Sequence, residues 1–300
     1  MKKLLLLIFV LVMMAPVMAQ NDDDRYKDSG IDFFIGAGVY MPGKATANYY
    51  NGSAANAKSS TGGNTLGYLF NNSSWKERID RSIVEHNRHI SLDNLSKYTL
   101  ECPEDMRYSP SLYIQLGAKY RFNKNVALSI AYSFSRCKAK DVFLLRYKTY
   151  ELGNEHADYL TYDLVGKENR SFIDLIFTYL FDTGSMVEPF IEIAGQFNFV
   201  RVKSFQAIIE GEEYTLLDVY QGSQYVANTQ MQTFKVNQGG AGGGFAGALG
   251  LKLKVSKVVS LDPVFFIGGS YINLDEPYNK FTLNYGAQVR IVMNDSFFNK

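Results

Sequence analysis

The sequence predicts an all-β protein: an eight-stranded antiparallel up-and-down transmembrane β-barrel with short periplasmic turns and long extracellular loops, one of them carrying a short helix. Three observations predict it. Apolar residues alternate with small or polar residues over segments of roughly ten residues, the connections alternate between short and long, and no long apolar run follows the first 19 of the 300 residues. The charge is nearly balanced, with 31 Lys+Arg against 30 Asp+Glu, which argues against a nucleic-acid binder.

Residues 1–19 have the pattern of a secretory signal peptide. A basic start (Lys2, Lys3) precedes an apolar run from Leu4 to Met14, and Ala19 supplies the small residue before a cut. The alternative is an uncleaved membrane anchor. The apolar run is shorter than the roughly 20 residues that a transmembrane helix needs, so we expect cleavage.

The strands are expected where apolar residues alternate. They are expected near 31–41, 111–122, 126–135, 171–181, 188–200, 244–255, 258–271 and 281–292. Only three residues separate the second strand from the third, which predicts a hairpin in which Ser111 lies opposite Cys137. Pro263 removes one donor from a ladder and should lie at a distortion.

The lengths of the connections predict the architecture. The barrel is expected over 31–293, between a periplasmic segment 20–30 and a C-terminal tail 294–300. The extracellular loops are expected at 42–110, 137–170, 201–243 and 272–280, with protruding hairpins around 143–164 and 205–220. A secreted β-sandwich could show the same alternation. However, Gly, Ala, Ser and charged residues fill the second face of the strands, as the interior of a narrow barrel requires.

This pattern resembles the small eight-stranded outer-membrane β-barrels of Gram-negative bacteria, the OmpA/OmpX/OmpW-like group. The resemblance covers the alternating segments and not the loops. It implies a location in the bacterial outer membrane, in contact with membrane lipid. One feature departs from the group, whose chains typically end on an aromatic residue: here Asn299 and Lys300 follow Phe298.

Charged residues on the second face should meet inside the barrel. They are Asp32, Lys119, Arg121, Glu188, Glu192, Lys252, Lys254, Asp262 and Arg290. Buried charges need partners, and a mixture of both signs supplies them, so we expect an ion-pair plug that stiffens the barrel. The alternative is a gate whose pairs rearrange to admit water or small ions.

Two features are expected in the loops. An apolar stripe on a helix near 74–90, formed by Trp75, Ile79, Ile83 and Ile90, should pack across the barrel mouth or on another loop, or else dock a partner protein. Cys102 and Cys137 both fall on the extracellular side and could form a disulfide as a loop staple.

The sequence contains no assembled catalytic set and implies no cofactor and no metal. His86 and His89 could reach one metal ion from a helix, but a solvated face is the simpler interpretation. The Gly242–Gly247 segment matches G-x-G-x-x-G without a βαβ context, so crowding between strands explains it better than a nucleotide.

We therefore expect a non-enzymatic surface protein that acts by adhesion or as a subunit of an envelope or secretion complex, with an extracellular or envelope protein as partner. A narrow channel for small or apolar solutes is the alternative. An outer-leaflet lipid-modifying enzyme that uses His156 with Glu155 or Asp158 is less favoured, because none of the three histidines lies on a strand expected to face the lipid.

Overall fold

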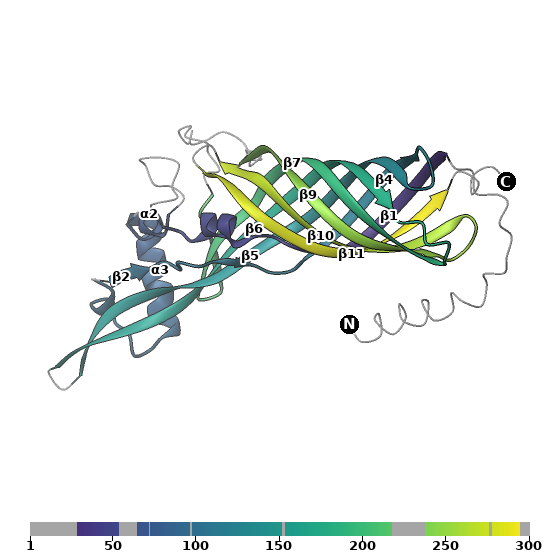
Figure 1. Ribbon diagram of the computed structural model, residues 1–300. Helices are drawn as coiled ribbons and strands as arrows, with labels where there is room; N and C mark the ends of the chain where they lie inside the picture. Colours follow the sequence, from purple (N-terminus) through teal and green to yellow (C-terminus); the bar gives the residue numbers. More distant parts are fainter. Residues whose placement is uncertain are drawn as a thin grey trace, which may run out of the picture.

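The computed structural model of the chain describes residues 29–53, 65–71, 73–96, 98–151, 154–217, 238–275 and 278–294 (Figure 1). The predicted signal peptide 1–19, residues 20–28 of the predicted periplasmic segment and residues 295–300 of the predicted tail lie outside these ranges. Among the described residues, no helix is long and apolar enough to cross a bilayer.

Eight strands close into a ring. They are β1 (Gly30–Met41), β4 (Ser111–Arg121), β5 (Val126–Glu151), β6 (Asn154–Leu180), β7 (Val187–Ile209), β9 (Gly239–Lys254), β10 (Val259–Asp275) and β11 (Tyr278–Asn294). Each pairs antiparallel with the next in this order, and β11 returns to pair with β1, from Asp32 opposite Asn294 to Met41 opposite Tyr285. The predicted fold class and strand number are confirmed.

The turns and register also follow the predictions. The connections 122–125, 181–186 and 255–258 are short and lie at one end of the barrel, which we call the turn end. Tyr113 lies opposite Ser135, as the predicted hairpin requires. The ladder between β9 and β10 is interrupted where Pro263 falls, between the Leu261 and Val264 pairs.

Large apolar side chains cover the outside of the barrel. Ile130, Ile193, Phe197, Leu249 and Leu283 are each between 60 and 68 % exposed. Water would penalise such a surface, whereas hydrocarbon accepts it. We call this outward apolar surface of the eight strands the belt; it makes the barrel a membrane-spanning one.

Three strands extend beyond the belt, and there the apolar face inverts. On β5, Ile130 and Tyr132 point outward in the belt, whereas Phe143, Leu145 and Tyr147 are buried on the inner face farther along. An apolar residue in lipid faces out and one above the lipid faces in, so the inversion marks where the strand leaves the membrane.

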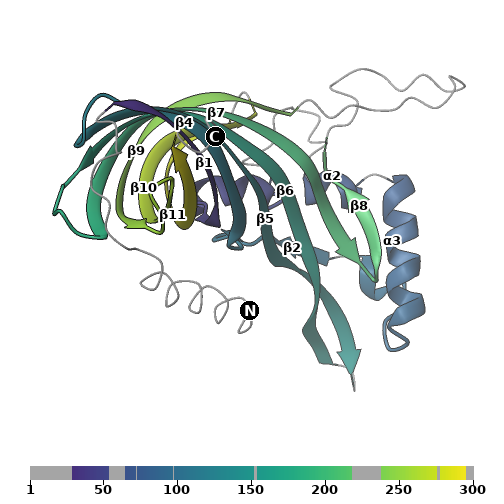
Figure 2. The same cartoon turned by 90° about the vertical axis from the view of Figure 1, so that its right-hand side faces the viewer.

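The extended parts of β5, β6 and β7 form what we call the blade. The strands β2 (Tyr98–Glu101) and β3 (Arg107–Tyr108) pair with β5, and β8 (Glu212–Thr215) pairs with β7. Figure 2 shows the blade sweeping away from the ring. The expected hairpins are therefore present, but most of 137–170 is strand and not loop, because β5 and β6 pair without a break from Val126–Tyr179 to Glu151–Asn154.

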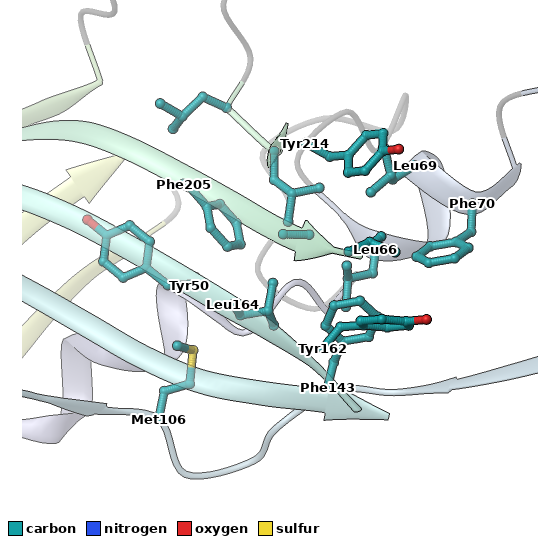
Figure 3. Close-up of a cluster of buried hydrophobic side chains, with 14 of the residues drawn as sticks. Tyr50, Leu66, Leu69, Phe70, Met106, Phe143, Tyr162, Leu164, Phe205 and Tyr214 are labelled. Atoms are coloured by element: carbon teal, nitrogen blue, oxygen red, sulfur yellow. The ribbon is translucent and has the colours of Figure 1, made fainter. Parts of the chain in front are cut away.

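The remaining elements are η2 (Lys44–Tyr50), α2 (Leu66–Asn71), α3 (Ser73–His86) and η4 (Asn94–Ser96). The first of them, η2, lies at the blade end of the lumen, against β6 and β11, and the other three cover the inner face of the blade. In Figure 3, Leu66 and Phe70 of α2 lie against Phe143 and Leu164 of the blade. All four side chains are fully buried in one continuous apolar cluster.

The predicted helix stripe packs inside the chain. Ile79 and Ile83 are fully buried and Ile90 is 3 % exposed, so these three side chains are not free to dock a partner protein. Trp75 keeps 41 % of its surface exposed while its ring meets the Tyr214 ring edge-on at 5.8 Å. The stripe therefore fastens α3 to the blade.

Truncating Ile83 to Ala should release α3 from the blade. The cavity left in the cluster should cost about 2–5 kcal/mol of local stability, seen as faster hydrogen–deuterium exchange in α3 of the detergent-solubilised protein. Arg81→Ala is the control, because the Arg81 side chain is 68 % exposed and its ion pair among the described residues is with Glu77 on the same helix. Equal exchange in the two variants would contradict the packing role of Ile83.

The contact between α3 and β8 should weaken in acid. A hydrogen bond from Tyr214 Oη (2.7 Å) and the Arg78 guanidinium (3.2 Å) hold the pKa of Glu212 below its ordinary value. A carboxyl group with a depressed pKa stabilises the fold above its unfolded pKa, and this contribution disappears as the pH falls through the folded pKa. In NMR titration, Arg78→Gln should raise the pKa of Glu212, whereas Arg81→Gln should leave it unchanged. An unchanged pKa in Arg78→Gln would refute the coupling.

Candidate functional site

The barrel lumen gathers all nine of the predicted charges. Eight of them are buried, and Lys254 is half-buried at the turn end. The inward residues form layers along the barrel axis. We describe them from the turn end toward the blade.

The first layer lies at the turn end. Arg121 Nε of β4 donates to both carboxylate oxygens of Asp32 on β1, at 3.1 and 2.9 Å. Lys254 pairs with Glu188 across β9 and β7. Asp262 accepts a hydrogen bond from Ser260 Oγ at 2.8 Å.

Lys119, the next cation toward the blade, lies beside two aromatic rings. Lys119 Nζ lies 5.7 Å from the centre of the Phe190 ring and 6.0 Å from that of Phe34. The attraction between an ammonium group and a ring face compensates part of the cost of burying the charge. The Arg290 guanidinium lies 5.3 Å from the centre of the same Phe34 ring, so two cations share this ring.

The second layer is an ion pair in which one guanidinium nitrogen donates to both oxygens of a carboxylate. Arg290 NH1 of β11 donates to Glu192 Oε1 and Oε2 of β7, at 2.7 and 2.9 Å, and Thr178 of β6 donates to the same carboxylate at 3.2 Å. Both charged side chains are at most 4 % exposed. The pair spans the lumen, since β11 and β7 are not neighbours in the ring.

The third layer centres on Asp174, which the sequence analysis did not select. Its carboxylate accepts hydrogen bonds from Gln196 at 2.9 Å and from Ser133 at 3.2 Å, and Tyr113 in turn donates to Ser133 at 2.8 Å. Asp174 alternates with the outward apolar residues of β6. That alternation was the signal that could have identified it.

The fourth layer closes the blade end of the lumen, and it was also missed. Arg170 Nε donates to Glu168 Oε1 at 2.6 Å, and both side chains are fully buried. Tyr50 of η2 and Tyr108 of β3 donate to Glu168 Oε2 at 2.6 and 3.1 Å. A single carboxylate thus fastens two segments of the 42–110 region to the barrel wall.

Two further contacts seat η2 in this plug. Arg170 NH2 donates to Thr46 Oγ1 at 3.0 Å. The Tyr50 ring lies flat on Gly166, where an added Cβ would come within 2.2 Å of the ring. Only glycine leaves room for this approach. Both 42–110 and 166–170 fall in predicted loops, where the alternation of apolar residues does not indicate which segments meet.

The space left inside the lumen is small. One cavity of about 30 Å³ lies beside Asp32 and Lys119, and another of about 40 Å³ lies between Asp174, Glu192 and Arg290. Each has room for about two or three water molecules. Within the described part of the chain, these cavities are small compared with the buried side chains that line them.

The expected disulfide is absent, since both cysteines are free thiols. Cys137 is buried inside the barrel, whereas Glu101, next to Cys102, pairs with Leu144. Seven residues of extended strand separate Leu144 from Cys137, about 23 Å, and a disulfide requires Cα atoms within about 7 Å. Burial raises the pKa of the Cys102 thiol.

The remaining candidate motifs do not assemble into a site. His86 and His89 are exposed, and His86 Nδ1 contacts the Ser82 carbonyl at 2.8 Å. Within the described ranges, no group of three or more His, Cys, Asp or Glu residues could hold a metal. The Gly242–Gly247 segment lies in β9, and the side chain of His156 lies outside the description.

Comparisons with known proteins found similar solved structures but no family. No protein-family model and no curated protein matches the sequence. The similar solved structures include Neisserial surface protein A (TM-score 0.40, 12 % identity, 89 % of this chain and 99 % of that one), the outer membrane protein OprG from Pseudomonas aeruginosa (0.33, 10 %, 89 % and 94 %), and the translocator domain of autotransporter NalP from Neisseria meningitidis (0.24, 7 %, 96 % and 94 %).

These similarities concern shape alone. The class of protein is defined by the closed ring of eight strands. The chain is an outer-membrane-type eight-stranded β-barrel whose lumen is filled by paired side chains. To this barrel it adds a blade and helices with an apolar core of their own.

Removing one partner of the central ion pair should destabilise the barrel strongly. Glu192→Gln leaves the buried Arg290 charge without its carboxylate, at a cost of about 3–5 kcal/mol, measured as the free energy of unfolding by urea in lipid. The double variant Glu192→Gln with Arg290→Met should recover most of the loss. If single and double variants were equally unstable, packing volume rather than charge pairing would govern this layer.

Proposed function

We propose that this chain is a non-enzymatic protein of the Gram-negative outer membrane that acts as a surface binding or scaffolding protein through its blade and helices. Its partner would be an extracellular or envelope protein. The proposal rests on the contrast between the barrel lumen and the part of the chain beyond the belt. The lumen is blocked by four layers of paired side chains, whereas the chain builds an extensive ordered structure beyond the belt.

The asymmetry of the connections supports the orientation. The three short turns lie at the end opposite the blade, which is the arrangement in which short turns face the periplasm and large loops face outward. The predicted signal peptide 1–19 supports export. The belt supports contact with membrane lipid along the whole ring.

The filled lumen supports binding over transport. A solute would have to break the Glu192–Arg290 pair and then the Glu168–Arg170 pair, each of which is buried and held by further hydrogen bonds. Opening these pairs inside a low-dielectric interior costs several kcal/mol per charge. The blade offers an accessible alternative, for example through Tyr159, which is 63 % exposed.

Labelling on intact cells tests the orientation. In a Cys102→Ser background, a membrane-impermeant maleimide should label Arg81→Cys on α3 of intact cells. It should label Asp182→Cys, in a short turn, only after permeabilisation. The reverse pattern would show that the blade faces the periplasm and would overturn the surface assignment.

Conductance and cross-linking test the activity. The full chain reconstituted in planar bilayers should show no steady unitary currents, because the lumen is plugged; stable currents would establish the narrow channel instead. A photo-reactive residue at Tyr159 should yield a discrete protein adduct on cells, whereas one at Leu249 in the belt should not. No adduct from Tyr159 would contradict a binding role for the blade.

A further inference from the structure

We propose that the outward faces of β5, β6 and β7, just beyond the belt, bind the phosphate groups of an outer-leaflet glycolipid of the lipid A type. The site consists of five exposed cations, which we call the basic band: Arg136, Lys138, Lys167, Arg201 and Lys203. The inference rests on the proposed function, which places this end of the barrel at the outer leaflet.

The strand register places these cations directly above the belt. The last belt row across the three strands is Phe134, Ser171 and Phe199, with Ser171 Oγ 3.0 Å from Tyr132 Oη. One outward position farther along, Arg136 and Arg201 flank Asn169. Successive outward positions are about 7 Å apart, so these cations lie where lipid headgroups begin.

The next row concentrates the charge further. Lys138 on β5 lies directly opposite Lys167 on β6. On the other side of β6, a bulge sets Ser204 opposite Lys167 and Val202 opposite Glu168, which leaves Lys203 as an extra residue between them. Three ammonium groups thus originate from adjacent backbone positions on three strands.

Like charges at opposed positions repel, and the described residues do not neutralise them. Facing ammonium groups destabilise a sheet unless an anion lies between them. Among the ion pairs of the described ranges, none includes Arg136, Lys138, Lys167 or Lys203. Farther along β6, the carboxylate of Asp163 is already engaged by Lys140 at 2.7 Å. An external anion would supply the charge that the described residues do not give to these four cations.

The position of the band identifies the anion as part of a lipid. Arginine and lysine side chains are the usual ligands of phosphate, arginine by two parallel hydrogen bonds. At the equivalent edge of the opposite wall, β10 and β11 present Tyr271 beside Phe281 and then Asn273 beside Asn279, aromatic and amide groups without such a cluster. The basic band therefore provides a binding site for a phosphorylated lipid on one wall of the barrel, opposite the wall formed by β10 and β11.

Lipid titration of the full chain in detergent, followed by native mass spectrometry, tests the site. The band variant is Arg136→Gln, Lys138→Gln, Lys167→Gln and Lys203→Gln together. The matched control removes four exposed cations elsewhere: Lys44→Gln, Arg81→Gln, Arg88→Gln and Lys280→Gln. Arg201 is kept in both. All variants are first checked for the heat-dependent gel shift of a folded barrel.

Wild type and control should bind bisphosphorylated lipid A at least tenfold more tightly than its dephosphorylated form, and the band variant should lose that preference. Equal binding of the dephosphorylated lipid, or an unaffected band variant, would overturn the proposal. Displacement by millimolar inorganic phosphate, or equal affinity for phosphatidylglycerol, would overturn the assignment to this lipid. The assay does not depend on orientation, so its failure is distinguishable from failure of the labelling of Arg81→Cys.

Discussion

Backbone N–H and C=O groups inside a bilayer have no water to bond, so a sheet that crosses it must close on itself. Pairing of β1 with β11 supplies that closure, and the rest of the molecule depends on it. The ring fixes which side chains face lipid and which face the lumen. It also provides β5, β6 and β7 as the rigid base from which the blade extends. The blade needs no linker, because it shares its strands with the barrel.

Charge is distributed according to what surrounds it. Inside the lumen, carboxylates meet guanidinium groups at short distances, because an unpaired ion in that space would cost several kcal/mol. Glu168 shows the principle at its fullest, since one carboxylate accepts from Arg170, Tyr50 and Tyr108. Just outside the belt the balance is different, and Lys138 and Lys167 face each other across two strands. Charged side chains in the lumen are paired with one another, whereas Lys138 and Lys167 just beyond the belt are not paired with carboxylates of the described residues.

Alternation of apolar residues was sufficient to predict eight strands, the hairpin register around 122–125 and most inward charges, since the belt imposes a strict period of two. The same rule ended the predicted strands too early. Phe143 and Leu145 are buried on the face opposite to that of Ile130, so the pattern changes phase where the strand leaves the lipid. Pairs that join distant segments, such as Tyr50 with Glu168, leave no periodic signal and required the folded chain.

The unbroken run of β5 and β6 from the turn end to the blade tip has a mechanical consequence. Their hydrogen bonds lie across the strand direction and extend from Val126–Tyr179 to Glu151–Asn154. A pull on the tip along the strands therefore loads many of these bonds at once, in shear, instead of unzipping them one by one. Tension applied at the far end of these two strands would therefore reach the embedded ring with little stretching.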